Sequence, residues 1–396
     1  MKASVRSMVF FALVLMLFAG STTLIWAQTT PTQEQIRVKA KEYAYDLSET
    51  MVYDVVPTYS PYTAGKVSQK NLQSALNAVN LMRYIAGLPD DVELSEEYVN
   101  YAQHGAVLMA ASEFSHYPSQ PADMPDDFYQ LGLKGTSSSN IGWGYSNIVS
   151  SVVRGYMSDS DAGNIGAVGH RQWILSPDMK KIGFGMAGRH TATYVFDDSR
   201  SEQVTNDFFC WPAQNMPYEI YDDVYDSRYA FSVALSSSYR IPDAGQLTVD
   251  VTSKLKKQSW HLTTTNQDID NFLNISPQGY GGWDWTTLVF NVLDGKFDNG
   301  DEVRVVVSGL EKQGVPATVD YTVNFFSLEP RPLGDLNDDG KTDISDLMML
   351  AQAVNGRTAL TAEQSTAADV TGDGKADIAD LMKLAQFVNG KIDTLD

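Results

Sequence analysis

Hydrophobic positions recur with a helical period in the first half of the chain. Apolar residues between positions 71 and 82 fall three or four positions apart, and the pattern stops at Gly87. A second stretch with this spacing runs from Ser95 to Ala111. Ser95 suits the N-cap, and the acidic residues that follow it suit the first turn. We predict helices in both stretches and a further helix at residues 34–49.

The pattern changes to alternation between about residues 217 and 326. Short runs of alternating apolar and polar residues are separated by turns rich in Gly, Asp and Asn. This spacing is typical of a β-sandwich, and we predict an Ig-like sandwich over residues 214–328. No catalytic constellation stands out within it. The runs are residues 230–235, 247–251, 286–292, 303–307 and 319–326.

The N-terminus carries a targeting pattern. Lys2 and Arg6 precede an unbroken apolar run, residues 8–19, which is shorter than the ~20 residues that a membrane-spanning helix needs. With a candidate cleavage site after Ala27, the pattern predicts a secretory signal peptide at residues 1–27 and therefore a secreted, extracellular protein. No later segment of the sequence is apolar and long enough to predict a membrane span.

Composition narrows the classes of partner and fold. A chain of 396 residues fits about two to three domains. The formal net charge of −20 argues against nucleic acid or an anionic membrane as a partner, because both attract basic surfaces. A single cysteine, Cys210, cannot form an internal disulfide, so the domains must depend on hydrophobic cores and bound metals. We expect Cys210 to be buried and inert.

The C-terminal region contains an internal duplication. Residues 333–356 and 367–390 align without gaps at an offset of 34, with 15 of 24 positions identical. Each copy places oxygen-bearing side chains at positions 1, 3, 5, 9 and 12 of a twelve-residue loop, and a backbone carbonyl at position 7, which is the spacing that binds Ca²⁺. The predicted ligands are Asp335, Asn337, Asp339, Lys341, Asp343 and Asp346 in the first loop, and Asp369, Thr371, Asp373, Lys375, Asp377 and Asp380 in the second.

Each loop is followed by one apolar-striped helix, and each has Asp rather than Glu at position 12. Pro330 and Pro332 precede the first loop, so we expect no helix to enter it, and each copy reads as half an EF-hand. This arrangement resembles the type I dockerin module. The resemblance implies a small all-α module of two loop–helix repeats at residues 333–396, holding two Ca²⁺ ions, after a linker at residues 329–332.

A dockerin implies a cohesin module on a scaffold protein as partner. It also implies a cellulosome-type assembly, concerned with polysaccharide breakdown and held at a scaffold or cell surface. Because the two copies are nearly identical, either helix could face the partner, which is a dual-mode docking hypothesis. Alanine–glutamine pairs stand where many dockerins have a Lys-Arg pair, so the type of cohesin stays open. The partner-binding residues implied by the family are Ile344, Ser345, Ala351, Gln352, Ile378, Ala379, Ala385 and Gln386.

Two stretches in the N-terminal half carry a second resemblance. One is residues 105–121, which contains His116, and the other is GHRQWILSP, which contains His170. Together they resemble the bacterial secreted branch of the CAP superfamily, also called SCP-like, over residues 69–213. The resemblance implies an α-β-α sandwich with a large cleft. Residues 28–68 are then a leader, and the whole chain belongs to the α+β class.

The family's cleft carries two histidines and two glutamates, and His116 and His170 match the histidines. The family's Glu-Asn-Ile motif reads Ser139-Asn140-Ile141 here, so one glutamate is replaced, and the second has no clear counterpart. Without a carboxylate, two histidines hold a zinc ion weakly and a general base lacks its partner. We therefore expect the cleft to contain His116, Ser139, Asn140 and His170. We expect it to bind a peptide, lipid or glycan and not to be a catalytic site.

Two alternatives stay open. In the first, the domain is a hydrolase that uses His116 and His170, either a metal-assisted peptidase with an ion such as Zn²⁺ or a carbohydrate-active enzyme. In the second, it is a spacer or adhesin, and the histidines are hydrogen-bonded residues that position backbone. Asp159, Asp161 and Asn164 are predicted as turn residues with a second role in lining the cleft. The sequence fixes neither the ligand nor the oligomeric state.

Overall fold

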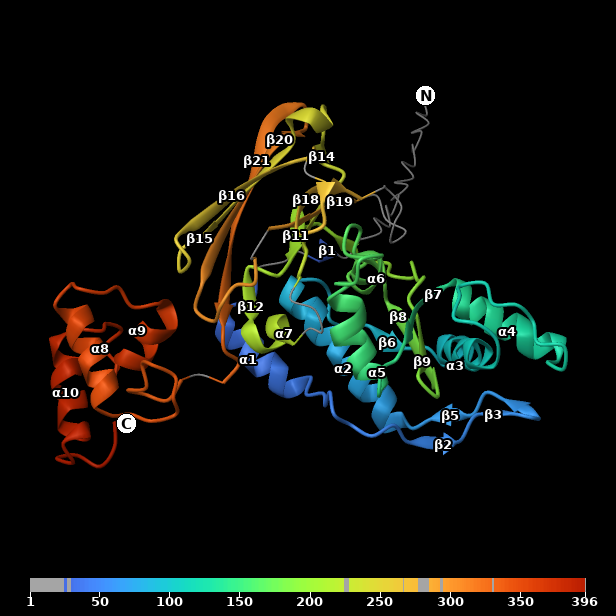
Figure 1. Cartoon of the computed structure of the whole chain (residues 1–396), viewed down its shortest axis with the longest axis horizontal. Helices are drawn as coiled ribbons and strands as arrows, with labels where there is room; N and C mark the ends of the chain where they lie inside the picture. Colours follow the sequence, from blue (N-terminus) through green and yellow to red (C-terminus); the bar gives the residue numbers. More distant parts are fainter. Residues whose placement is uncertain are drawn as a thin grey trace, which may run out of the picture.

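The computed structural model describes residues 25–26, 30–223, 228–265, 267–276, 285–292, 295–329 and 331–395. Apart from β1 (Ile25–Trp26), which pairs in parallel with β10 (Gln203–Val204), the predicted signal peptide lies outside the described residues. Pro330 of the predicted linker lies outside them as well. Over the described part of the chain, no helix combines the length and apolar composition needed to cross a membrane. The fold is mixed α+β, as predicted (Figure 1).

A four-stranded sheet lies between helices in the first part of the structure. Its strand order is β6 (Glu93–Leu94), β8 (Lys181–Ala187), β9 (His190–Tyr194) and β7 (Ser139–Trp143). Figure 1 shows α3 (Glu96–Ala111) and α4 (Asp126–Ser137) on one side, and α2 (Gln69–Ala86) and α5 (Ile148–Ser150) on the other. The π-helix η1 (Ser151–Met157) continues α5, and α6 (Gly169–Ile174) follows.

The β8 strand alternates between the two helical layers. Ile182, Phe184 and Met186 belong to the large core on the α2 side. The positions between them face α3, where a Cβ at Gly185 would clash with the backbone of Ala102. On the next layer, a Cβ at Gly135 of α4 would clash with the carbonyl of Tyr101. Glycine thus allows the sheet, α3 and α4 to pack in contact through their backbones.

The helices predicted near residues 71–86 and 95–111 are confirmed, and so are the residues predicted to end the first and to cap the second. The α2 helix stops at Gly87, which takes a left-handed conformation with φ 71°. The Ser95 side chain caps α3 by accepting a hydrogen bond from the backbone N–H of Tyr98 at 3.3 Å. The helix predicted at residues 34–49 is shorter, because α1 (Gln33–Glu42) ends before a turn in which Asp46 accepts from the N–H of Ser48 at 2.8 Å.

A narrow β-arm follows α1 and was not predicted. Its strands are β2 (Tyr53–Val55), β3 (Thr58–Tyr59), β4 (Tyr62–Thr63) and β5 (Lys66–Val67). They pair β2 with β5 and β3 with β4, both antiparallel. Figure 1 shows the arm extending away from the middle sheets, past α3.

Two sheets form the middle of the chain. The first has the order β11 (Phe208–Trp211), β13 (Phe231–Leu235), β19 (Thr286–Asn291), β18 (Asn271–Ile275) and β17 (Gln267–Asp268). The second has the order β12 (Asn215–Pro217), β21 (Val315–Phe326), β20 (Glu302–Lys312), β15 (Thr248–Ser253) and β16 (Gln258–Thr263), with β14 (Tyr239–Arg240) paired to β20. Each predicted run overlaps one of the strands β13, β15, β19, β20 and β21, although β15, β20 and β21 extend beyond their runs. The helix α7 (Tyr218–Asp222), before the first run, and the short helix η2 (Ala244–Gln246), between two runs, were not predicted.

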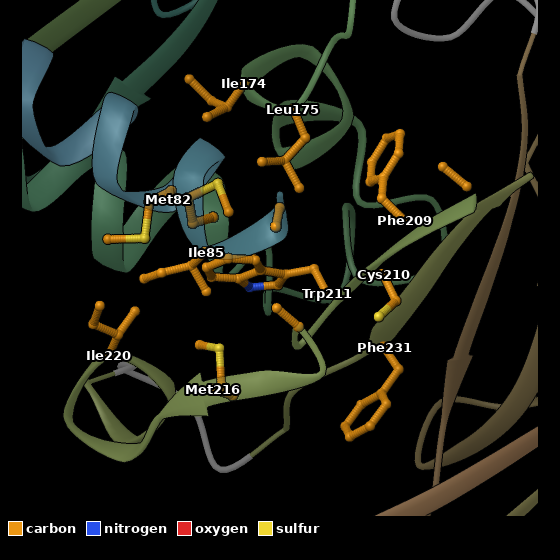
Figure 2. Packing of buried hydrophobic residues seen from close by; sticks show 14 of the residues in the cluster. Met82, Ile85, Ile174, Leu175, Phe209, Cys210, Trp211, Met216, Ile220 and Phe231 are labelled. Carbon is orange, nitrogen blue, oxygen red and sulfur yellow. The ribbon is translucent and has the colours of Figure 1, made fainter. Parts of the chain in front are cut away.

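The first sheet of the middle region shares its hydrophobic core with α2. Figure 2 shows Trp211 of β11 packed between Met82 and Ile85 of α2, Leu175 and Met216. The Trp211 indole N–H donates to the hydroxyl of Tyr229 at 2.6 Å. Its neighbour Cys210 is buried, as predicted, and burial raises the pKa of its thiol, which keeps the thiol protonated and unreactive.

Arg171 of α6 ties the two regions together through polar contacts. Its completely buried guanidinium donates to the carbonyls of Met157 at 2.7 Å and Ser158 at 2.8 Å. It also donates across the boundary to the carbonyl of Ala230 at 2.7 Å and to Ser232 Oγ at 3.3 Å. One charged side chain therefore satisfies carbonyls from both regions inside a common core.

The C-terminal part has a separate core. It contains α8 (Ile344–Val354), α9 (Ala362–Ala368) and α10 (Ile378–Val388) around an apolar cluster that includes Leu336, Leu350 and Leu384. The α9 helix leads directly into the second loop, so the second copy is a complete helix–loop–helix and the prediction of two half EF-hands is wrong there. Thr361 and Gln364 form a capping box at its start, which is the local signal that sequence reasoning missed.

We expect Arg171→Met to destabilise the fold by roughly 3 kcal/mol, because it leaves buried carbonyls from two regions without donors. Urea unfolding followed by tryptophan fluorescence measures this. The matched control is Arg304→Met, which removes an exposed ion pair with Asp320 and should change stability little. Equal effects of the two substitutions would contradict the assigned role of Arg171.

Candidate functional site

Two buried carboxylates organise the first C-terminal loop. Asp335 accepts hydrogen bonds from the backbone N–H of Asp338 at 2.7 Å and of Gly340 at 2.9 Å. Gly340 has φ 78°, a conformation that favours glycine at this sharp turn. Asp346, at the far end of the loop, accepts from the N–H of Leu336 at 2.8 Å. Backbone donors therefore orient both the first and the last carboxylate of the loop.

The second loop repeats this geometry. Asp369 accepts from the N–H of Gly374 at 2.8 Å, and Asp380 accepts from the N–H and the hydroxyl of Thr371 at 2.9 and 2.8 Å. Ligand oxygens of Asp369, Asp373 and Asp380 lie within 4.8 Å of one another, a grouping that can hold a metal ion. Burial alone would raise the pKa of Asp380, but hydrogen bonds from Asp377, Thr371 and the local backbone lower it below its usual value.

The ninth residue of each loop also starts a helix. Asp343 is the N-cap of α8 and accepts from the N–H of Ser345 at 2.7 Å. Asp377 is the N-cap of α10 and accepts from the N–H of Ala379 at 2.7 Å. The twelfth residue completes a capping box in both copies. Loop and helix therefore share the same carboxylates.

The remaining predicted ligands lie inside their loops. Asn337 donates to Asp339 at 3.1 Å, and Asp339 accepts from the N–H of Lys341 at 2.9 Å. In the second loop, the N–H of Lys375 donates to Asp373 at 3.0 Å. Both lysine side chains extend from exposed positions, so only their backbone carbonyls are suited to face an ion.

Each of the two helices presents an exposed apolar pair. Ile344 and Met348 on α8, and Ile378 and Met382 on α10, have exposed fractions between 57% and 60%. Residues four apart lie on one helix face, so each pair forms a continuous patch. The predicted partner residues Ser345, Gln352, Ala379 and Gln386 are exposed, and Ala351 and Ala385 are half-buried. The two methionines were missed, although they stand four positions after the isoleucines.

The structure brings the four predicted cleft residues together. His116, Ser139, Asn140 and His170 line one cavity of about 390 Å³. Asn164, which was predicted at a turn with a second role here, lines it too. This cavity lies where the segments before α4, at β7 and at α6 meet. Tyr117, Trp173 and Phe196 add an aromatic wall.

Asp159 supplies the carboxylate that sequence reasoning could not place. Its Oδ1 lies 2.7 Å from Nδ1 of His170, and its Oδ2 accepts from the N–H of His170 at 2.9 Å and of Arg171 at 3.3 Å. The side chain of Asp159 is only 1% exposed. Asp159 takes φ 48°, a left-handed conformation that aspartate tolerates better than most residues. Sequence patterns identified the turn but not its contact with a histidine eleven positions later.

This pairing changes the acid–base properties of His170. Burial by itself lowers the pKa of the imidazole. The charge and hydrogen bond of Asp159, with a smaller effect from the charge of Asp161, outweigh burial and raise the pKa above its usual value. The contact with Asp159 therefore favours the protonated ring of His170, which forms an ion pair with Asp159 inside the cleft.

His116 is held in a comparable way. Its Nδ1 lies 2.9 Å from the carbonyl of Thr136, whose hydroxyl donates back to the carbonyl of His116 at 2.9 Å. With both Nδ1 atoms bound to oxygen, Nε2 is the ring atom that each histidine offers to a ligand or metal. No group of three metal-ligating side chains gathers at this cleft among the described residues, so a zinc ion would have to rely on the two imidazoles and a ligand.

The floor of the cleft is formed by β7. The side-chain amide of Asn140 donates to the carbonyl of His170 at 2.9 Å. The Tyr156 hydroxyl donates to the carbonyl of Asn140 at 3.2 Å, and its ring lies 5.3 Å from that of His170. Within the described part of the chain, Ser139 Oγ is buried without a hydrogen-bond partner. Ser139, which stands where the family has a glutamate, is thus a small polar residue whose hydroxyl makes no hydrogen bond with the described residues.

Comparison with known families identifies two domains in the chain. Residues 76–197 match the model of the Cysteine-rich secretory protein family, CAP, and residues 333–389 match the Dockerin type I domain. The comparisons with curated proteins and with solved structures gave no match. A dockerin implies docking to a cohesin in a cellulosome-like complex, and the two domains together indicate an extracellular protein. The chain therefore combines a domain of the CAP family with a C-terminal dockerin type I domain.

Proposed function

We propose that this protein is secreted after removal of residues 1–27, docks through its calcium-loaded dockerin onto a scaffold cohesin, and presents a ligand-binding CAP cleft within a polysaccharide-degrading assembly. The observation that carries the docking function is the duplicated loop, in which carboxylates suited to an ion also start a helix with an exposed apolar pair. The cavity that contains His116 and His170 supports the ligand-binding function.

The proposed domain boundaries are those predicted from the sequence. We propose the CAP domain at residues 69–213, an Ig-like sandwich at 214–328 and the dockerin at 333–396. Two sheets whose apolar faces contribute to one core support the sandwich. Among its described strands, neighbours pair antiparallel except β12 with β21. Because that core includes α2 and β8, the first two domains are best viewed as one rigid unit.

Calcium has a clear physical role in the dockerin. Clustered carboxylates repel one another, and the small apolar core around Leu350 and Leu384 stabilises the module only weakly. An ion in each loop would neutralise the carboxylates and contribute its binding free energy to folding. We propose all twelve loop positions predicted from the sequence as the ligands of two ions.

We expect a calcium chelator to make residues 333–395 of the full-length protein sensitive to protease, while the CAP and middle regions stay resistant. Cohesin affinity should fall on the order of 100-fold, because ordering the helices then lacks the free energy of ion binding. Limited proteolysis and calorimetric titration with a cohesin measure the two effects. Equal protease resistance with and without chelator would contradict the role of calcium.

The two exposed pairs provide a matched test of dual-mode docking. We expect Ile344→Asp/Met348→Asp and Ile378→Asp/Met382→Asp each to weaken cohesin binding only about twofold, because one docking face remains. The quadruple variant should lose binding, since both apolar faces are then charged. Calorimetry against one cohesin measures all three. Loss of binding in one double variant alone would show a single docking mode.

A hydrolase is the second candidate function for the cleft. The observation that favours it is the contact between Asp159 and His170, which gives a histidine the carboxylate partner that a general base needs. In that case the Nε2 of the neutral ring, which predominates only above the raised pKa of His170, would accept a proton from an attacking water. Activity profiling on peptide and polysaccharide substrates decides between the functions: a wild type as inert as His116→Ala/His170→Ala excludes the hydrolase.

We expect Asp159→Asn to lower the pKa of His170 below that of wild type, because burial remains while the charge of Asp159 is removed. Since the folded-state pKa of His170 is raised, its contribution to stability is complete below the pKa of an unfolded histidine and is lost as pH rises through the folded value. Imidazole NMR titration measures the shift. Asp161→Asn is the control and should lower the pKa less. An unchanged His170 pKa in Asp159→Asn would contradict the ion pair.

A further inference from the structure

We infer that the CAP cleft recognises a neutral saccharide, an inference that rests on the proposed ligand-binding function and names its ligand class. The cleft combines hydrogen-bonding groups that carry no net charge, once His170 is counted with its partner Asp159, with an exposed aromatic wall. A sugar ring has the matching pattern, with apolar C–H groups on its faces and hydroxyls around its edge. The cavity volume of about 390 Å³ is within the usual range of small-molecule sites.

The charge of the cleft points to a neutral ligand. No lysine, arginine, aspartate or glutamate is among the described residues that line it. His170 is paired with Asp159 behind it, so the protonated ring and the carboxylate largely cancel. A charged ligand would lose its hydration here without gaining a counter-ion, which is unfavourable.

The aromatic wall provides a stacking surface. Trp173 and Phe196 stack with ring centroids 3.8 Å apart at an interplanar angle of 23°. Phe196 is 41% exposed and Tyr117 is 73% exposed at the same cavity. The faces of aromatic rings carry partial negative charge and attract the C–H groups of a sugar face. Trp173 covers one face of Phe196, so the exposed ring is ordered before a ligand arrives.

Polar groups lie around this wall. Nε2 of His116 and of His170 is the ring nitrogen opposite the bound Nδ1 in each histidine. The Ser137 hydroxyl and the Asn164 side-chain amide belong to half-buried residues that line the same cavity, so they can hydrogen-bond to sugar hydroxyls, directly or through a water molecule.

The same features disfavour a lipid and an extended peptide. An acyl chain would remove water from imidazoles, hydroxyls and amides without replacing their hydrogen bonds. A peptide adding to the β7 edge needs free backbone groups, but the carbonyl of Asn140 already accepts from the hydroxyl of Tyr156. A saccharide uses both the apolar and the polar parts of the lining.

The test is calorimetric titration of the calcium-loaded full-length protein with tetrasaccharides of β-1,4-linked glucose, xylose and mannose. We expect at least one to bind, and Phe196→Ala and Tyr117→Ala each to weaken it about threefold to tenfold. Asn164→Ala should weaken it to a similar extent, because it removes an amide that lines the cavity and can hydrogen-bond to a sugar hydroxyl. Tyr59→Ala, an exposed aromatic on the β-arm, is the matched control and should have no effect.

Lysophosphatidylcholine and a pool of capped tetrapeptides are titrated in parallel, each also against His116→Ala/His170→Ala. Histidine-dependent binding of either, without saccharide binding, overturns the saccharide assignment and leaves the ligand-binding cleft standing. Failure of every probe to bind overturns both. Saccharide binding that Phe196→Ala, Tyr117→Ala and Asn164→Ala leave unchanged places the ligand elsewhere and also overturns the assignment.

Discussion

The buried guanidinium of Arg171 is the interaction on which the geometry of the cleft depends. It binds carbonyls that precede Asp159 on one side, and the carbonyl of Ala230 just before β13 together with Ser232 in β13 on the other. The next residue back is His170, whose backbone and ring are both held by Asp159. The loop between Asp159 and His170 is therefore fixed at both ends. The orientation of one cleft histidine thus depends on a contact with the middle region, which explains why the two regions share a core.

The dockerin must stabilise its fold with few apolar residues. Its core is small, so its order must come from elsewhere. The same aspartates start the helices and line the loops, so an ion bound in a loop would be coupled to helix formation at the level of single side chains. The exposed isoleucine and methionine pairs begin immediately after these caps. A contact face built this way is present only when the loop is ordered.

Features encoded in local spacing could be predicted from the sequence, and features created by tertiary contact could not. The helices at α2 and α3, the five long strands and the two loops follow from periodicity, caps and repeated ligands. The α9 helix was missed because it is short and lacks a clear apolar stripe, although its Thr361 and Gln364 cap was visible. Asp159 was predicted only as a turn residue, because its contact with His170 requires a left-handed backbone and spans ten intervening residues.

The glycines that bring α3 and α4 against the sheet act on the cleft from a distance. Gly185 sets how near α3 lies to β8, and Gly135 sets how near α4 lies to α3. The end of α4 provides Thr136, which orients His116. His170 is oriented by a different set of contacts, through Asp159 and Arg171. The distance between the two imidazoles therefore depends on two separate sets of packing contacts. A methyl group added at Gly135 or Gly185 would move α4, and with it His116, away from His170 without touching either ring.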